Sequence, residues 1–494
     1  MNKIKIIVDA VCGSRLFPCI FPLIAVPFLL LFSTSTSPLF VHGGFDSAIF
    51  VEMGLGILRG RVPYVDLFDS KGPVLFFINA AGHGYTGVFI LQCIAMSVTL
   101  WLLYKSACLI ASPGKALLSL LAMLFFYAAI MHYGNLAEEW MLPMLAWALW
   151  ATMRLFKDFS ARNVTLCGVA LGLAFGWMFF IRINDAVGLV GGMATGVFLW
   201  LAWSRRWRDA IRLALLFMAG AVAIALPVLV WFAAHGALSR MWYGIYGINV
   251  VYSGGFASHI SNFLLRVPGW CLVMMLVGVG AAVAATPMRR ALWALVPAFV
   301  LEVLMFGPRF NDYYYIVLMP FVVIFFAALT TQKNRSLLVL GVVFSMLWTV
   351  QWERNIVAKE ALATAFNNAM DIVSPARQAE DMLRRDEAAR LFAHIPDSER
   401  DSVWNHNIVD CKYDFYHTLP QNGIVQMNPR IFPILHSWRN HPDPVPLGSD
   451  APLWLLVGHT GRLEAAIDSS TLERYLPVDT TDPAVGHVVL LRRK

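Results

Sequence analysis

The sequence predicts a polytopic α-helical membrane protein with a small α/β domain at its C-terminal end. The 494 residues are 58% hydrophobic and 14% charged, whereas soluble domains contain about 25% charged residues. Apolar runs such as FPCIFPLIAVPFLLLF carry no charge over nearly the length that crosses a bilayer. The net charge of +7 comes from short basic clusters between such runs, which is typical of membrane orientation signals and not of nucleic-acid binding. These features exclude a large soluble protein.

About eleven apolar segments are expected to cross the membrane. The second segment, at 73–104, is too long for one straight crossing, so we expect it to begin as a re-entrant or interfacial piece. The segments lie at 16–34, 73–104, 116–131, 137–153, 164–181, 186–203, 211–234, 263–285, 291–306, 313–330 and 336–350.

Basic residues cluster in every second connector, which predicts that these connectors lie together in the cytoplasm. The clusters are Lys3, Lys5 and Arg15; Lys105 and Lys115; Arg154, Lys157 and Arg162; Arg205, Arg206, Arg208 and Arg212; Arg289 and Arg290; and Lys333 and Arg335. The N-terminus is then cytoplasmic, and an odd number of spans puts the C-terminal region outside. The N-terminal charge order resembles a signal peptide, but no small-residue cleavage site follows, so an uncleaved signal anchor is expected.

The composition changes near residue 352, which predicts a membrane domain at 1–351 and an extracytoplasmic α/β domain at 352–494. Residues 353–400 are charged and compatible with helices. The runs SVWNHNIVD, PLWLLVGH and HVVLLRR then resemble short strands separated by Pro, Gly and Asp.

Neither a disulfide framework nor a metal site is indicated. The seven cysteines contain no CxxC pair. His42, His83, His132 and His259 are expected on the outer face, but they lack the tight spacing of metal ligands. We therefore expect no cofactor, with a divalent metal kept as an alternative.

Ionisable residues gather at the non-cytoplasmic ends of the spans, above all in the extracytoplasmic loop at 35–79. Charged groups near membrane depth are costly and tend to mark functional sites. They are Asp46, Glu52, Asp66, Asp69 and Lys71 in the loop, and then Glu138, Glu139, Arg182, Asp185, Arg309 and Asp312. Carboxylates beside Arg and Lys suit a general base that works next to an anionic leaving group such as phosphate. Apolar surroundings suit a substrate with a lipid tail, so the pattern favours sugar transfer from a lipid phosphate carrier.

The sequence GGFDSAIF, followed by GILRGRVPYVDLFDSKGPVLFFIN, resembles the GT-C superfamily of integral-membrane glycosyltransferases. The nearest group is that of the protein O-mannosyltransferases and lipid A aminoarabinose transferases. The Gly60–Asp66 segment and the Lys71-Gly72-Pro73 turn match its first-loop motifs, and the Tyr-rich stretch at 312–320 matches the start of a late span. Two departures stand out: a second acid often follows the first in this family, where Ser47 stands here, and the turn is often Lys-Pro-Pro.

The resemblance implies a fold with an outward-facing catalytic loop and an inverting transfer with Asp46 as the general base. The donor would be a polyprenyl-phosphate sugar, and the acceptor an extracytoplasmic glycan, lipid or protein at a bacterial plasma membrane. Lys71, Arg182 and Arg309 are expected to hold the donor phosphate. The expected supporting residues are Asp66, Asp69, Glu138, Glu139, Tyr313 and Tyr314.

Plainer interpretations stay open for each of these residues. Asp46 also suits the N-cap of the helix that follows it, and Asp69 and Lys71 suit a local pair across a turn. Arg182 and Arg309 also suit interfacial anchors. A transporter or flippase for a lipid-linked or polyanionic substrate is the main alternative function, and a non-catalytic envelope assembly protein is a third.

Overall fold

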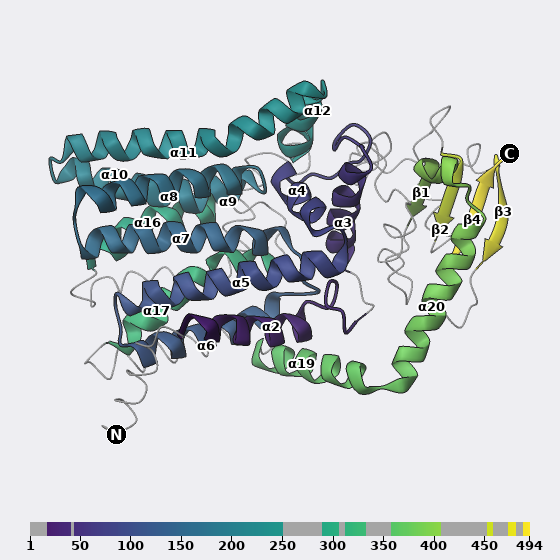
Figure 1. Ribbon diagram of the computed structural model, residues 1–494, viewed down its shortest axis with the longest axis horizontal. Helices are drawn as coiled ribbons and strands as arrows, with labels where there is room; N and C mark the ends of the chain where they lie inside the picture. Colours follow the sequence, from purple (N-terminus) through teal and green to yellow (C-terminus); the bar gives the residue numbers. More distant parts are fainter. Residues whose placement is uncertain are drawn as a thin grey trace.

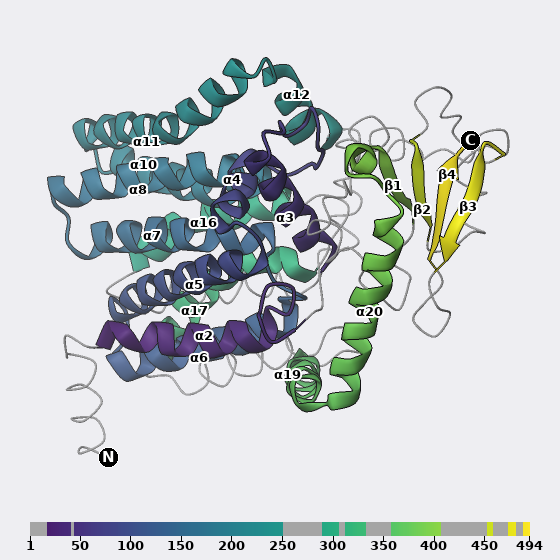
Figure 2. The same cartoon turned by 45° about the vertical axis from the view of Figure 1, so that its right-hand side comes forward.

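The computed structural model describes residues 17–40, 44–249, 289–305, 312–331, 357–406, 452–457, 473–480 and 488–494. Figure 1 shows a bundle of helices that lie side by side, with a smaller unit of helices and a sheet at one end. Figure 2 shows α20 standing between the bundle and the sheet, with α19 seen end-on.

The helices of the bundle in the described ranges are α2 (Ile20–Phe32), α3 (Phe45–Leu58), α4 (Pro73–Gly82), α5 (Tyr85–Cys108), α6 (Pro113–Ile130), α7 (Ala137–Lys157), α8 (Ala161–Phe179), α9 (Ile183–Asp185), α10 (Gly192–Trp203), α11 (Trp207–Ala234), α12 (Leu238–Trp242), α16 (Arg289–Met305) and α17 (Met319–Thr330). Short 3₁₀ or π-helical pieces extend several of them: η1 (Phe17–Cys19), η2 (Ala186–Gly191), η3 (Tyr243–Gly247) and η4 (Asp312–Leu318).

Five helical stretches in the described ranges are long and apolar enough to cross a membrane: Tyr85–Cys108, Pro113–Ile130, Ala161–Phe179, Ile183–Trp203 and Trp207–Ala234. Shorter apolar helices lie at Phe17–Phe32, Pro73–Gly82 and Tyr313–Ala328. The spans predicted at 263–285 and 336–350 lie outside the described residues. The mainly helical, membrane-embedded character of the chain is confirmed.

The long apolar stretch predicted at 73–104 is divided into two helices, α4 and α5. The break lies at His83 and Gly84, whose φ angles are 53° and 116°. Both values fall in the left-handed region, which ends a right-handed helix. The stretch is therefore not one straight crossing, in agreement with the prediction from its length.

The two ends of the bundle differ in charge. The helices α5, α7 and α10 run away from the sheet unit, so the basic connectors that follow them lie at the far end (Figure 1). The acid-containing helices α3 and α9 lie at the end near the sheet unit. The predicted grouping of basic connectors at one end is thus observed for the connectors within the described ranges.

The C-terminal unit contains α19 (Val357–Val373), α20 (Pro375–Ala393), η5 (Asp397–Ser402), β1 (Val403–His406), β2 (Trp454–Val457), β3 (Tyr475–Thr480) and β4 (Val489–Arg493). The strands form one sheet in the order β1-β2-β4-β3. Strand β1 is parallel to β2, and β4 is antiparallel to both β2 and β3. The predicted strand runs contain β1, β2 and β4, whereas β3 was not expected.

One buried apolar cluster connects this unit to the bundle. Leu391 and Phe392 of α20 pack with Trp454 and Leu490 of the sheet, and Ala48 of α3 belongs to the same cluster. Ala48 is fully buried. The helix that carries Asp46 is therefore in contact with the core of the C-terminal unit.

Candidate functional site

The first loop is attached to the end of α8 by its backbone. The amide of Gly72 donates to the Ile181 carbonyl at 2.9 Å, and the amide of Val74 donates to the Phe180 carbonyl at 3.0 Å. A side chain at position 72 would collide with the backbone of Phe180 and Ile181. The Lys-Gly-Pro turn thus has a steric cause: glycine allows the close approach that brings Lys71 beside Arg182.

Tyr64 holds the turn that precedes Lys71. It is 2% exposed, and its hydroxyl donates to the Lys71 carbonyl at 2.6 Å. Its ring packs against Phe68, Phe76 and Phe232 with centroid distances of 5.7–6.4 Å. Its φ of 67° lies in the left-handed region, a conformation that a bulky residue keeps only where surrounding contacts impose it. The backbone at Lys71 is therefore held by a tyrosine that is itself packed in an aromatic cluster.

Arg182 lies between two buried carboxylates and one aromatic ring. Its Nη1 pairs with Glu138 Oε1 of α7, and its Nε lies 3.2 Å from Asp185 Oδ2. Its guanidinium carbon lies 4.2 Å from the centre of the Tyr314 ring. The Arg182 side chain is 12% exposed, while those of Glu138 and Asp185 are 1% and 0% exposed. The interpretation of Arg182 as a snorkelling interfacial residue is therefore wrong.

Lys71 lies within electrostatic range of Arg182, Glu138, Asp46 and Tyr314. Burial alone would lower the pKa of Lys71, but the nearby Tyr314, Glu138 and Asp46 outweigh it and raise that pKa. Lys71 is therefore a fixed cation. Together with Arg182 it forms a pair of positive charges at the end of the bundle.

Asp69 supports the Lys71 turn through the backbone. Its Oδ1 accepts a hydrogen bond from the Lys71 amide at 2.7 Å. Burial raises the pKa of Asp69 to about 6, although Lys71 partly offsets the effect. The predicted local pairing of Asp69 and Lys71 is thus seen as a side-chain to backbone contact.

Asp46 lies in the first turn of α3, close to the cations. The helix begins after Gly44 as its N-cap, and no side chain caps it, so the interpretation of Asp46 as an N-cap is wrong. The hydroxyl of Tyr313 donates to Asp46 Oδ2 at 3.4 Å. The ring of His132 packs edge-on against Tyr313 at 5.2 Å. Asp46 is half-buried, which suits a carboxylate that must be reached by a substrate.

A buried amide network fixes the helix that carries Asp46. The side-chain nitrogen of Asn135 donates to Ser47 Oγ at 3.0 Å and to Asn79 Oδ1 at 3.1 Å. The indole of Trp140 donates back to Asn135 Oδ1 at 2.9 Å. Ser47, the residue that departs from the family pattern, is thus used to connect α3 with α4 and α7.

Two predicted supporting residues lie outside this cluster. Asp66 is exposed, and its Oδ2 accepts from the Val62 amide at 2.7 Å, which closes a local turn. Glu139 instead accepts from Gln92 Nε2 at 2.9 Å and from the Leu136 amide at 3.1 Å. Neither set of contacts involves Lys71 or Arg182, and the supporting role expected for Asp66 and Glu139 stays a prediction. Arg309 lies outside the described residues.

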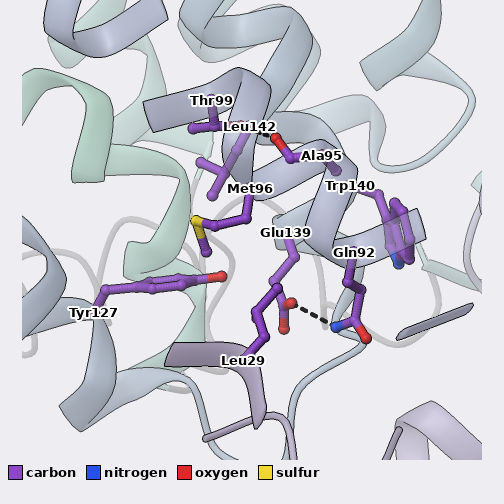
Figure 3. A pocket seen from close by; sticks show the side chains of 9 residues that line it. All are labelled: Leu29, Gln92, Ala95, Met96, Thr99, Tyr127, Glu139, Trp140 and Leu142. Atoms are coloured by element: carbon purple, nitrogen blue, oxygen red, sulfur yellow. Dashed lines mark hydrogen bonds between the residues drawn. The ribbon is translucent and has the colours of Figure 1, made fainter. Parts of the chain in front are cut away.

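Glu139 faces a separate small pocket between α2, α5, α6 and α7. Figure 3 shows the Tyr127 ring and the Glu139 carboxylate on its wall, with Gln92 beside them. The other lining residues are Leu29, Ala95, Met96, Thr99, Trp140 and Leu142. Adjacent residues of a helix project about 100° apart, so Glu138 and Glu139 serve two different networks.

Two acids that the sequence left without a role lie behind Arg182. Asp185 is the residue that pairs with it, and Glu302 of α16 lies close to both. Glu302 is a single acid inside an apolar segment and is completely buried. An isolated acid in a predicted span is itself a signal of function, and this signal was available in the run VLEVLM.

Across the described ranges, no group of three or more His, Cys, Asp and Glu side chains is arranged to hold a metal ion.

Comparison with known proteins finds a matching family model and solved structures of similar fold. A family model described as dolichyl-phosphate-mannose-protein mannosyltransferase matches residues 74–231. ArnT from Cupriavidus metallidurans, whose structure was determined bound to undecaprenyl phosphate, is similar with a TM-score of 0.56 at 13% identity, over 97% of this chain and 98% of that chain. The Archaeoglobus fulgidus oligosaccharyltransferase, in complex with Zn and sulfate, is similar with a TM-score of 0.50 at 13% identity, over 96% of this chain and 72% of that chain. No curated protein sequence matches this chain. The resemblance predicted from the first loop is confirmed.

Proposed function

Because this chain resembles the GT-C glycosyltransferases of the ArnT and protein mannosyltransferase type, we propose that it transfers a sugar from a polyprenyl-phosphate donor to an acceptor hydroxyl. The main support from the chain itself is the convergence of Asp46, Lys71 and Arg182 from three separate segments. The half-buried carboxylate of Asp46 then lies at the end of an apolar bundle near two cations, whose other carboxylate neighbours, Glu138 and Asp185, are fully buried. That set provides a base and a phosphate clamp beside a surface that suits a lipid tail.

In the proposed step, the acceptor hydroxyl attacks the anomeric carbon of the donor sugar. Asp46 takes the hydroxyl proton, a bond forms from the acceptor oxygen to the anomeric carbon, and the bond from that carbon to the phosphate oxygen breaks. The configuration at the anomeric carbon is inverted. The Tyr313 hydroxyl, 3.4 Å from Asp46 Oδ2, orients the carboxylate for this proton transfer.

Lys71 and Arg182 stabilise the negative charge on the departing phosphate. Arg182 presents a planar fork suited to phosphate oxygens, and Lys71 supplies a compact charge. The carboxylates of Glu138 and Asp185 and the ring of Tyr314 fix the guanidinium before the donor arrives. Such preorganisation stabilises the transition state without reorganisation during the reaction. Arg309 is proposed as a further phosphate ligand on the basis of its sequence position.

We place the reaction at the extracytoplasmic face of a bacterial plasma membrane. The basic connectors lie at the opposite end of the bundle (Figure 1), and such connectors face the cytoplasm in most membrane proteins. The C-terminal unit is then outside the cell, where it can bind or screen an acceptor glycan, lipid or protein.

The test is turnover of polyprenyl-phosphate sugars by the purified protein and by Asp46→Asn. The substitution keeps the size of the side chain but removes the base, so turnover should fall by about 100-fold or more, while donor binding stays close to that of the wild type. Asp66→Asn is the matched control, because Asp66 is an exposed acid of the same loop that serves only a turn. Retained turnover in Asp46→Asn would show that another group is the base.

The same assay separates transfer from transport. A transporter or flippase would bind the donor and leave it intact in both proteins. Donor consumption by the wild type and by Asp66→Asn, but not by Asp46→Asn, supports the transferase.

A further inference from the structure

Behind Arg182, four buried carboxylate oxygens accept no hydrogen bond of normal geometry within the described part of the chain. They are both oxygens of Asp185 and both oxygens of Glu302; Asp185 Oδ2 lies 3.2 Å from Arg182 Nε in an ion pair. Both residues are 0% exposed. Buried polar atoms are nearly always hydrogen-bonded, and an exception needs a cause. Here the two unsatisfied groups face each other.

Glycine brings Glu302 into this position. Gly188, Gly192 and Gly196 follow one another at every fourth residue and lie against the backbone of α16. A side chain at Gly188 would collide with the carboxyl group and the backbone of Glu302 itself. This spacing of small residues is a common means of close helix packing in membranes. The contact holds the Glu302 carboxyl within interaction range of Asp185.

The surrounding charges make two ionised carboxylates unfavourable. Arg182 is the cation that faces the pair, and its other side is already paired with Glu138. Lys71 and Tyr314 lie beyond Arg182 in the same cluster. The Leu189 amide also faces Glu302. Two adjacent carboxylates in a low dielectric do not both ionise, and a single shared proton removes the repulsion.

We propose that Asp185 and Glu302 form a proton-binding pair, in which protonated Glu302 donates a hydrogen bond to ionised Asp185 and thereby positions Arg182. The charge belongs to Asp185 because its Oδ2 lies 3.2 Å from Arg182 Nε. A protonated carboxyl is both a donor and an acceptor, so one proton supplies a hydrogen bond between the two carboxyl groups.

The pair orients the phosphate clamp without contacting the substrate. Asp185 and Glu138 occupy Nε and Nη1 of Arg182, which leaves Nη2 as the amine that turns toward a phosphate. Glu302 is thus a positioning residue that acts through Asp185. This part of the inference rests on the proposed phosphate-binding role of Arg182, whereas the shared proton does not.

Infrared difference spectroscopy of the full-length protein in lipid bilayers tests the shared proton directly. At neutral pH the wild type should show the carbonyl stretch of a protonated carboxylic acid, shifted in D₂O and absent from Glu302→Gln. Glu139→Gln is the control, since Glu139 is a buried acid in the separate Gln92 network, and the Glu302 band should persist in that variant. If no such band is lost in Glu302→Gln, the proposal is overturned.

Binding of undecaprenyl phosphate tests the positioning role. Glu302→Gln keeps an N–H that can donate to Asp185, so its affinity should remain within about twofold of the wild type, whereas Glu302→Leu should bind about 10- to 100-fold more weakly, because it loses a hydrogen bond to a charged group. Equal affinities in Gln and Leu variants that melt like the wild type would refute the role. If Glu302→Leu does not fold, an affinity of Glu302→Gln far below that of the wild type would still refute the positioning role, and the infrared band would still test the shared proton. Absence of binding even by the wild type would count against the proposed function and would leave the infrared result unaffected.

Discussion

Two arginines of this protein each pair with one glutamate and one aspartate, but one arginine is largely buried and the other is exposed to water. Arg182 lies between Glu138 and Asp185 with its side chain 12% exposed. In the C-terminal unit, Arg390 lies between Glu387 and Asp479 with its side chain 43% exposed. Exposed ion pairs contribute little to stability, whereas a buried charge left without its partner is very costly. The comparison teaches that burial, and not the list of partners, decides how much the loss of an arginine should cost the fold.

The sharpest test of this comparison is Arg182→Met. Removal of the guanidinium leaves Glu138 and Asp185 as buried carboxylates without a cation, so the free energy of unfolding should fall by about 3–5 kcal/mol. Binding of undecaprenyl phosphate should be lost as well. Thermal unfolding in detergent and a binding titration measure the two effects. If Arg182→Met and Arg390→Met lose the same stability, burial does not separate the two clusters.

A second test compares the pH dependence of two aspartates. Burial raises the pKa of Asp69 from 3.8 to about 6. The folded state therefore binds this proton more tightly than the unfolded chain, so the free energy of unfolding should fall as the pH rises from about 4 to 6, by up to about 3 kcal/mol. The difference between the wild type and Asp69→Asn isolates the effect, and a flat difference would contradict it.

Asp479, whose side chain is 22% exposed, should behave in the opposite way. Burial opposes its ionisation, but the Thr480 amide, His394 and Arg390 together outweigh burial and lower the pKa of Asp479. Its contribution is present above the pKa of the unfolded chain and is lost as the pH falls through the lower, folded pKa. The loss of unfolding free energy caused by Asp479→Asn should thus be smallest in strong acid.

A third test compares two glycines of the same π-helical piece, η2. Gly188→Ala forces Glu302 and α16 away from Asp185 and should cost about 1–3 kcal/mol, as overpacking of a buried contact does. Gly191→Ala is the control, because a methyl group there would meet the Ala186 carbonyl oxygen at 3.6 Å and one atom of Phe175 at 3.8 Å, which are ordinary contacts. Thermal unfolding of both variants measures the difference. Equal melting temperatures would show that the bundle relaxes around position 188.

The smallest effect is expected for Arg390→Met. Its ion pairs with Glu387 and Asp479 are open to water, so the substitution should cost at most about 1 kcal/mol, and less when salt screens the charges. Unfolding at low and high ionic strength measures this. A loss that is large and independent of salt would mean that this cluster, too, supports a buried contact.

The sequence predicts the helical membrane fold and much of the site because both leave strong patterns. Apolar length predicts spans, and acids and bases at span ends predict a charged cluster. Asp46, Lys71 and Arg182 were found in this way. Asp66 and Glu139 contact other groups than Lys71 and Arg182, because a position in the same loop or turn does not fix the direction of a side chain. A rotation of one residue in α7 separates Glu139 from the site.

Other features depend on contacts between distant segments and were not predictable. Glu302 reaches Asp185 only because Gly188 allows α16 to approach. Strand β3 contains Pro477 and a register shift between Pro477 and Asp479, so its sequence lacks a regular strand pattern. The Gly72 turn likewise shows its cause only against the backbone of Phe180. In each case a neighbour far along the chain decides the local structure.

The burial of Ala48 in the core of the C-terminal unit has a consequence for biogenesis. Ala48 is made early in translation, yet its packing partners Leu391, Trp454 and Leu490 are made last. The helix that carries Asp46 therefore reaches its final environment only after the end of the chain has emerged and folded. A chain truncated after Thr331 should leave position 48 accessible, and thiol labelling of Ala48→Cys in the truncated and full-length proteins would show it. The surroundings of Asp46 are therefore complete only after the C-terminal unit has been synthesised and has folded.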